Sequence, residues 1–326
     1  MTLRFDLTIS ISSFNRDDKI GQTLEHLFRS DISRFERIEV LVIDDGSPRP
    51  VRNVIDRMGP PPEKMHLRLI EQENAGIGAT RNRGFCEARS DLVLFLDDDI
   101  LVKPTTLNEF VDAQRRHAGS VVFGSYPFVS HETRALERFA SRLYGYDRIT
   151  EEPRYEKVDA ITSGLLCVDR TKFGGWEKLY RDDLTIPAAE EHEVIFRFDK
   201  LKIPIVHARH IFATHNHHLE LKWIASQQFK YGEATAEVFA KVPDIIEMER
   251  FARLRVTLDR LKGKGIKNFM RRFLASSAGR TFLIGVSTLA QTMSPNGDHR
   301  KLFGYLTTAY FWGGFLNYNK ARARQE

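Results

Sequence analysis

The first half of the chain alternates short apolar runs with stretches whose apolar residues recur every three or four positions. The short runs are rich in β-branched residues and predict strands at 6–12, 38–43, 67–70, 92–96 and 121–124. A stretch with helical periodicity follows each of the first four runs. Such alternation is typical of right-handed βαβ crossovers and a mostly parallel sheet. The sequence therefore predicts an α/β fold with helices flanking the sheet.

The second half of the chain has a different pattern. Residues 130–157 are polar and contain one helical segment, so we interpret them as a mobile insert. The predicted elements that follow are a strand pair at 160–168, a helix at 190–201 and a histidine-rich strand at 207–218. Beyond Leu219 the pattern is helical, with breaks near Pro243, Gly263 to Gly265 and Pro295. We expect two domains, residues 1–218 and 219–326.

Composition narrows the possibilities only slightly. The 326 residues carry a formal charge of +5, which suits nucleic acid, anionic lipid or phosphate-bearing ligands alike. The two cysteines, Cys86 and Cys167, lie far apart and predict neither a disulfide framework nor a metal knuckle. We see no signal peptide and no apolar run near the roughly 20 residues that cross a bilayer. We therefore expect a cytoplasmic protein.

Acidic residues stand at the ends of two predicted strands. Asp44 and Asp45 follow the strand at 38–43, and three aspartates at 97–99 follow the strand at 92–96. Parallel strands would bring both groups to one sheet edge, where a divalent cation bridging a diphosphate would relieve their repulsion. The first pair is equally explained as a solvated turn, since Asp, Gly and Ser favour turns. Three consecutive aspartates exceed what a turn or cap needs.

A glycine-bearing segment, NAGIGATRNRG at 74–84, lies between these two acidic groups. It is similar to a phosphate-binding helix start, where backbone donors and arginines meet an anion. It lacks the later glycine of a dinucleotide fingerprint and the lysine of a P-loop. The alternative is a helix capped by Asn74 with solvated arginines.

Taken together, the segments VIDDGS at 42–47, NAGIGATRNRG at 74–84 and FLDDD at 95–99 resemble the signature of glycosyltransferase family 2. The opening ISISSFNR at 9–16 resembles that family's first strand and loop, with serine in place of the usual proline. The resemblance covers roughly the first 200 residues. It implies a GT-A fold, which is Rossmann-like, and in this chain we expect a helical C-terminal extension to that fold. It also implies an inverting enzyme that transfers a sugar from a nucleotide diphosphate sugar to an acceptor hydroxyl.

The resemblance also implies a donor site. Asp45 would contact the nucleotide base or ribose, Arg81 would face the diphosphate, and Asp97 would hold the ribose or a metal-bound water. Asp99 would ligate Mn²⁺ or Mg²⁺, which would neutralise charge on the departing diphosphate. The donor-binding residues implied in this way are Phe14, Asn15, Arg16, Asp44, Asp45, Arg81, Asp97 and Asp98.

A general base is also required for inversion, because the acceptor hydroxyl must lose its proton. The segment 189–197 resembles the family's Glu-Asp motif, which implies that Glu191 is the base and that Glu190 holds the acceptor or orients the helix. Glutamate at 191 replaces the commoner aspartate and adds one methylene. The alternative is that these residues only complement a helix dipole. Trp176 would be a sugar platform or, alternatively, a core residue.

Five late histidines invite a zinc interpretation, but their spacing fits no finger or protease pattern. They are His207, His210, His215, His217 and His218. Related enzymes use one late histidine as a metal ligand, and His215, just past the apolar run IFAT, is the candidate that the resemblance implies. We interpret the others as surface or core histidines.

The C-terminal helices combine basic and aromatic residues, as in 266–286 and 301–318. They could lie on an anionic membrane surface, cover the core or form a homodimer contact. The expected partners are a nucleotide-sugar donor, with UDP before GDP or dTDP, and a glycan or lipid-linked acceptor. Peripheral contact with the inner membrane face stays open.

Three other functions compete with this one. A sugar nucleotidylyltransferase would carry a glycine-rich basic loop near residue 10, where this chain has ISISSFNRDD. A nucleic-acid-binding protein would need a clustered basic and aromatic face, whereas the basic residues here are dispersed and aspartates crowd the predicted cleft. We therefore expect no nucleic acid. An inactive nucleotide-binding relative is the third, and Glu191 argues against it.

Overall fold

The computed structural model describes residues 5–128, 134–217, 219–263, 265–295 and 297–324. They form two compact units, each described here by itself. The first unit comprises the chain up to Pro127, Tyr146–Asp182 and Arg197–His217. The second comprises Phe128–Gly145, Asp183–Phe196 and the chain from residue 218 onward. Two segments that precede residue 218 therefore cluster with the C-terminal helices.

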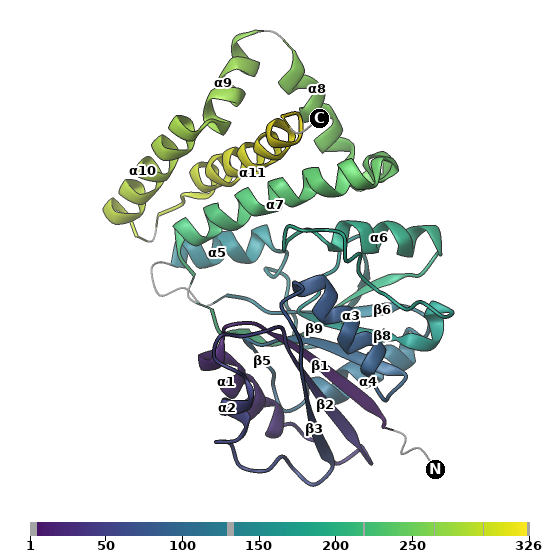
Figure 1. Ribbon diagram of the computed structural model, residues 1–326. Helices are drawn as coiled ribbons and strands as arrows, with labels where there is room; N and C mark the ends of the chain where they lie inside the picture. Colours follow the sequence, from purple (N-terminus) through teal and green to yellow (C-terminus); the bar gives the residue numbers. More distant parts are fainter. Residues whose placement is uncertain (1–4, 129–133, 218, 264, 296, 325–326) are drawn as a thin grey trace. The chain divides into compact units, whose positions relative to one another are not determined.

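An eight-stranded sheet is the framework of the first unit, in the order β3-β2-β1-β4-β8-β6-β9-β7 (Figure 1). Its strands are β1 Leu7–Ser13, β2 Ile38–Asp44, β3 Met65–Glu71, β4 Leu92–Asp97, β6 Val121–Ser125, β7 Tyr155–Lys157, β8 Leu165–Asp169 and β9 Ile205–Phe212. The first four are parallel to one another, as are β6 and β9. Only β7 and β8 run antiparallel to the strands they pair with. The predicted mostly parallel α/β fold is confirmed.

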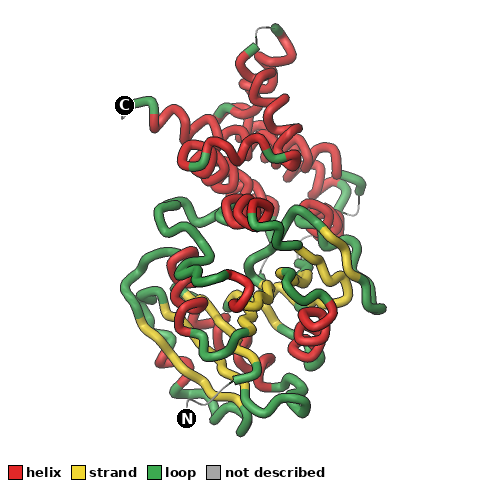
Figure 2. Tube along the Cα trace, turned by 90° about the vertical axis from the view of Figure 1, so that its right-hand side faces the viewer, coloured by secondary structure: helices red, strands yellow, loops and turns green. Residues whose placement is uncertain are grey.

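Helices lie between the strands in sequence and pack against the sheet, whose strands are yellow in Figure 2. They are α1 Asp17–Phe28, α2 Arg52–Ile55, α3 Ile77–Glu87 and α4 Thr106–Arg116, with the 3₁₀ turn η1 at Arg170–Phe173. In α1, Ile20, Leu24 and Leu27 are buried at spacings of four and three, which gives the helix one apolar face. Every residue of β1 and β2 is buried, which is why these central strands lack a polar face.

The region after β6 differs from the prediction in one respect. The structure has a single strand, β8, where a strand pair at 160–168 was expected. The neighbouring strand β4 ends at Asp97, which bonds Gly164, so β4 offers no partner to the residues that precede Gly164. The expected insert at 130–157 contains α5 Arg134–Leu143 and β7, while 129–133 lie outside the described residues. Cys86 and Cys167 are free thiols, as predicted.

Helices make up most of the second unit. They are α5, the first turns of α6 Glu191–Lys200, α7 Leu221–Lys241, η2 Pro243–Glu247, η3 Glu249–Phe251, α8 Ala252–Lys262, α9 Ile266–Ala275, α10 Ser277–Met293 and α11 Arg300–Arg322. Helices α7, α8 and α10 end near the predicted breaks, whereas the break at Ser276 between α9 and α10 was not predicted. One core cluster includes Ala236 of α7, Leu261 of α8 and Trp312 of α11.

Two glycines allow α7 and α11 to approach each other closely. A β-carbon at Gly232 would overlap the carbonyl oxygen of Phe311, and one at Gly314 would overlap the carbonyl oxygen of Phe229. Both obstacles are backbone atoms, so neither can move without shifting a helix. The crossing therefore depends on the absence of side chains at these positions.

Gly314→Ala is expected to lower the free energy of unfolding by about 1–3 kcal/mol, because overpacking forces the helices apart. The matched control on the same helix is Gly304→Ala, where a β-carbon would meet nothing within 4 Å. This control should be neutral or stabilise by up to about 1 kcal/mol, since alanine favours helix over glycine. Urea denaturation followed by circular dichroism measures both. Equal effects of the two variants would contradict the proposed close crossing.

Candidate active site and metal centre

The acidic strand ends meet at one edge of the sheet, as predicted. In the parallel register Ser13 of β1 lies beside Asp44 of β2, and Ser12 lies beside Asp97 of β4. The strand order reverses here, because β2 and β4 flank β1 on opposite sides. Ligands of open α/β sheets bind at such switch points, outside the carboxyl ends of the strands.

Asp44 and Asp45 are buried and hold the loops that surround this edge. The Asp44 carboxylate accepts backbone hydrogen bonds from Ser47 and Val51, both at 2.9 Å. The Asp45 carboxylate accepts from the Gln72 side chain at 2.7 Å and from the backbone of Ala75 and Gly76 at 3.0 and 2.9 Å. Asp44 and Asp45 therefore belong to a turn, but their side chains are buried rather than solvated. Through Asp45 it fixes the start of the glycine-bearing segment.

Arg81 of α3 lies at the same edge. Its guanidinium is 2.9 Å from the Asp97 carboxylate and 5.6 Å from the centre of the Tyr180 ring. Gly164 makes room for this carboxylate, because a β-carbon there would overlap the Asp97 carboxylate. The arginine is buried rather than solvated, and it holds the side chain of Asp97 in place.

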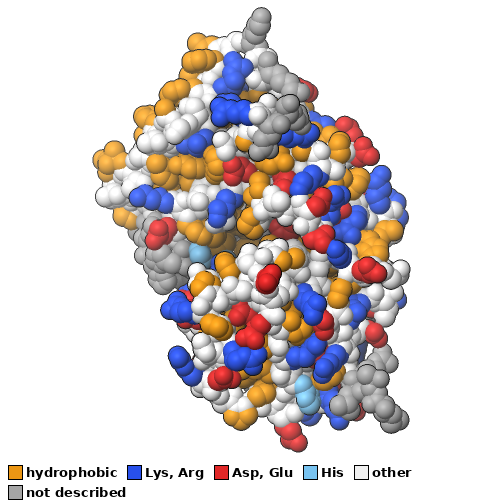
Figure 3. Space-filling view, viewed as in Figure 1, with side chains coloured by type: hydrophobic (Ala, Val, Ile, Leu, Met, Phe, Trp, Pro, Cys, Tyr) orange, Lys and Arg blue, Asp and Glu red, His pale blue; other side chains and the backbone are white. Residues whose placement is uncertain are grey.

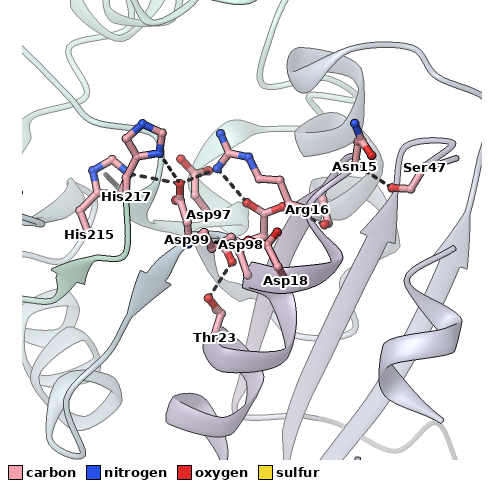
Figure 4. A network of polar contacts seen from close by, with 12 residues as sticks. Asn15, Arg16, Asp18, Thr23, Ser47, Asp97, Asp98, Asp99, His215 and His217 are labelled. Carbon is pink, nitrogen blue, oxygen red and sulfur yellow. Dashed lines mark hydrogen bonds and ion pairs between the residues drawn. The ribbon is translucent and has the colours of Figure 1, made fainter. Parts of the chain in front are cut away.

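Asp98 is buried and contacts residues of β1 and α1. Its carboxylate accepts a hydrogen bond from the Ser13 hydroxyl at 2.7 Å and faces Arg16 at 3.2 Å, while Thr23 donates to its backbone carbonyl (Figure 4). Burial raises the pKa of Asp98 to about 7, and the neighbouring aspartates add to this effect while Arg16 opposes it. Asp98 therefore ties the triplet to β1 and α1.

Asp99 faces two histidines from a distant part of the chain. The short strand β10, Thr214–His215, pairs antiparallel with β5, Ile100–Leu101, directly after the triplet. This pairing places His215 Nε2 3.3 Å and His217 Nδ1 3.9 Å from the same Asp99 oxygen (Figure 4). Arg16 also contacts that oxygen. His215 thus lies where the resemblance implied, and His217 is a residue that the sequence analysis assigned to the surface or core.

Charges around this cluster favour an ionised Asp99 and a neutral His217. Burial raises the pKa of Asp99, but the hydrogen bond from His215 and the charges of His215 and Arg16 outweigh it and lower the pKa to about 2. Burial, together with the charge of His215, lowers the pKa of His217 to about 4. An ionised carboxylate and a neutral imidazole are the forms that bind metals.

The ligand atoms of Asp99, His215 and His217 lie within 4.8 Å of one another. One carboxylate and two imidazoles form a mixed oxygen and nitrogen ligand set, which divalent transition-metal cations accept more readily than Mg²⁺ does. With three ligand atoms this close together, these residues fit a divalent cation. A cation bound here would share the Asp99 oxygen with Arg16.

The loop at the end of β1 borders this site. Phe14 is exposed, and Asn15 adopts a left-handed backbone conformation with φ of 53°, which asparagine tolerates. The backbone N–H of Asn15 donates to the Ser47 hydroxyl at 2.9 Å, which joins the loop to the turn after β2. The predicted residues Phe14, Asn15, Arg16, Asp97, Asp98, Asp99 and His215 therefore lie around one edge of the first unit.

The predicted catalytic glutamates belong to the second unit. Glu190 is buried immediately before α6, and Glu191 is the first residue of that helix. Burial raises the pKa of the Tyr231 hydroxyl on α7, and the charges of Glu191 and Glu190 raise it further. The carboxylates thus lie near enough to Tyr231 for their charges to influence its pKa. Their roles as base and acceptor-binding residue stay predictions.

Other candidates from the sequence have packing roles. Trp176 is partly buried and stacks on Phe198, and the Arg197 guanidinium lies 4.4 Å from the centre of the Trp176 ring. His207 is buried, stacks on Phe123 and bonds the Ser125 hydroxyl at 2.8 Å. His210 is buried beside Tyr155. His218 lies outside the described residues.

Sequence comparison assigns the family. The sequence pattern of the family described as Glycosyl transferase family 2 matches residues 8–173, which are slightly more than half of the chain. The chain belongs to glycosyltransferase family 2. The matched range contains the acidic strand ends, the glycine-bearing segment and β8. The resemblance predicted from three motifs is therefore confirmed.

Two curated relatives are named as glycosyltransferases or glucosyltransferases. The Bacillus subtilis protein EpsH, which is named as a glycosyltransferase, is 23% identical over 194 residues, or 58% of this chain and 50% of EpsH. A Campylobacter jejuni protein named GalNAc(5)-diNAcBac-PP-undecaprenol beta-1,3-glucosyltransferase is 25% identical over 93 residues, 28% of this chain and 29% of that protein. The chain thus spans half or less of the length of these relatives.

Solved structures support the fold of this family 2 chain. The mannosyltransferase PcManGT from Pyrobaculum calidifontis, in complex with GDP-Man and Mn²⁺, superposes with a TM-score of 0.61 at 15% identity. The likeness covers 98% of this chain and 88% of that one. At such low identity it is a finding about architecture, and it confirms the predicted GT-A fold.

Proposed function

We propose that this protein is a metal-dependent, inverting glycosyltransferase that moves a sugar from a nucleotide diphosphate sugar to an acceptor hydroxyl. The acceptor would be a glycan or a lipid-linked saccharide in polysaccharide or glycolipid biosynthesis. The observation that carries the proposal is the meeting of Asp99, His215 and His217 beside Asp97 at the switch point of a family 2 sheet.

Different residues at this edge would bind different parts of the donor. The Phe14 loop and the segment that Asp45 fixes would contact the nucleoside. Asp97, held by Arg81 at 2.9 Å, would take the ribose or a metal-bound water. Because these side chains are anchored before the donor arrives, little ordering cost remains to oppose binding.

Asp99, His215 and His217 would hold the divalent cation, here proposed to be Mn²⁺ with Mg²⁺ as the alternative. When bound, such a cation stabilises the negative charge that develops on the departing nucleoside diphosphate. Arg16 contacts both Asp98 and Asp99, so it balances the acidic cluster when no cation is present. The solved complex of PcManGT with GDP-Man and Mn²⁺ supports this choice of metal.

Glu191 would accept the proton of the acceptor hydroxyl as that oxygen attacks the sugar carbon from the face opposite the diphosphate. Its position at the start of α6 gives it a rigid support. Glu190, buried one residue earlier, would orient this helix start. Inversion follows from a single displacement on the sugar carbon.

Calorimetric titration tests the donor site. We expect one of UDP, GDP and dTDP to bind well-folded protein with Mn²⁺ present and at least about tenfold more weakly without it, since the cation would offset the charge of the diphosphate. The corresponding monophosphate is the control, because it lacks the second phosphate that the cation would share. If no nucleotide diphosphate binds with or without Mn²⁺, the proposal is wrong.

A further inference from the structure

Helices α9 and α10 carry a set of exposed apolar side chains that belongs to neither the core nor the site. Its members are Ile266, Phe269, Met270 and Phe273 on α9, and Phe282, Val286, Leu289 and Met293 on α10. Spacings of three and four place each set on one side of its helix. We call these eight residues the apolar stripe. In Figure 3 hydrophobic side chains gather along the edge where Figure 1 shows α9 and α10.

The stripe is not the packing face of α10. That helix packs on its neighbours α9 and α11 with a different side, where Gly279, Leu283, Ser287 and Gln291 are buried. The stripe, by contrast, is open to solvent, with Met293 77% exposed. At the other end Ile266 is 80% exposed. Side chains of this size are left exposed in a group mainly where a protein meets a partner or a membrane.

Positive charge surrounds the stripe. Residues 260–297 contain seven Lys or Arg and no Asp or Glu. Lys267 and Arg271 are exposed and lie beside stripe residues on α9. Apolar side chains flanked only by cations complement a surface with an apolar interior and anionic headgroups.

These helices do not have the form of a membrane span. Within the described ranges, no single helix is long and apolar enough to cross a bilayer. The α9 and α10 segments reach the required length and hydropathy only as a pair, and they are bent by 77° at their junction. A basic, amphipathic pair of this kind suits the plane of the interface.

We propose that the α9–α10 face docks on the surface of an anionic lipid bilayer through the apolar stripe, with Lys267 and Arg271 facing the headgroups. A second copy of this chain would fit the α9–α10 face less well than a bilayer. A twofold contact places the same patch on both sides of the interface, so it would bring two sets of cations together. The proposal is separate from the proposed function, because vesicle binding can be measured without nucleotide.

Flotation of the full chain with lipid vesicles tests the docking. We expect it to float with vesicles of about 30% phosphatidylglycerol in phosphatidylcholine at low salt, and at least about tenfold less with phosphatidylcholine alone. Lys267→Gln with Arg271→Gln should weaken binding to the anionic vesicles by about thirtyfold, at about 1 kcal/mol per basic residue. High salt should have a similar effect.

The apolar contribution has its own matched variants. Phe282→Ser with Leu289→Ser should reduce vesicle binding at least about tenfold, because two large side chains no longer enter the bilayer. Leu201→Ser with Val256→Ser removes two exposed apolar side chains elsewhere and should leave it unchanged. Unchanged melting curves would show that the variants fold.

A direct readout comes from tryptophan fluorescence. Brominated lipid should quench Phe282→Trp more strongly than Val256→Trp, after the wild-type signal is subtracted. Absence of binding to anionic vesicles at low salt would overturn the proposal. So would a dimer in sedimentation that dissociates in Phe282→Ser with Leu289→Ser while vesicle binding is unaffected.

Discussion

Asp99→Asn is expected to lower sugar transfer at least about a thousandfold and to abolish the Mn²⁺ dependence of nucleotide binding. The substitution removes the negative charge of Asp99. One oxygen of this carboxylate lies close to His215, His217 and Arg16. Stabilisation of leaving-group charge by a cation amounts to several kcal/mol, and about 4 kcal/mol corresponds to a thousandfold in rate. Mn²⁺ titration followed by electron paramagnetic resonance measures the lost metal site without any acceptor.

The control for Asp99→Asn is Asp112→Asn, the same change in an exposed aspartate 2.7 Å from Arg34 in the same unit. It should keep wild-type binding of nucleotide and Mn²⁺. Asparagine is nearly isosteric with aspartate, so both variants should fold. If Asp99→Asn binds Mn²⁺ as tightly as the wild type, the cation does not use this cluster.

Glu191→Gln is expected to lower the transfer rate by about 10²–10⁴ while the affinity for the donor nucleotide stays unchanged. Glutamine keeps the size of the side chain and the start of α6, but it cannot accept the acceptor's proton. The measurement is release of nucleoside diphosphate from the donor that calorimetry identifies, with donor binding measured on the same sample. A fall in kcat at constant Kd separates a base from a binding residue.

Glu249→Gln is the matched control, because Glu249 is an exposed glutamate of the second unit. It should transfer sugar at the wild-type rate. Should Glu191→Gln also transfer at that rate, Glu191 is not the base, and the alternative that it complements the dipole of α6 explains its position. The donor site would be unaffected by that result, because it lies in the first unit.

The alternation of apolar runs was enough to predict the sheet and its parallel half. Central strands such as β1 and β2 are buried on both faces, so their apolar pattern is nearly continuous and easy to recognise. Parallel register then places the ends of β2 and β4 at one edge, which follows from the strand pattern alone. Asp44, Asp45 and the aspartate triplet were therefore predictable as neighbours.

The sequence could not show that Asp44 and Asp45 are buried turn residues. Whether a carboxylate faces solvent or a loop depends on which loop folds over it, and here segment 72–76 closes on Asp45. Arg81 is a similar case. Its ion pair with Asp97 depends on the space left by Gly164, a residue whose pattern in the sequence is that of an ordinary strand.

What the sequence by itself determined is the order of the strands and helices, the acidic edge and the membership of family 2. Local periodicity and short motifs carry that information. Only the tertiary structure decided the proposed metal cluster, because His217 reaches Asp99 through the pairing of β10 with β5, two strands that lie far apart in the chain. The alternating positions of His215 and His217 were the available signal. The partner of a two-residue strand is set by packing rather than by local sequence. The positions of His215 and His217 alone therefore could not predict that both lie beside Asp99.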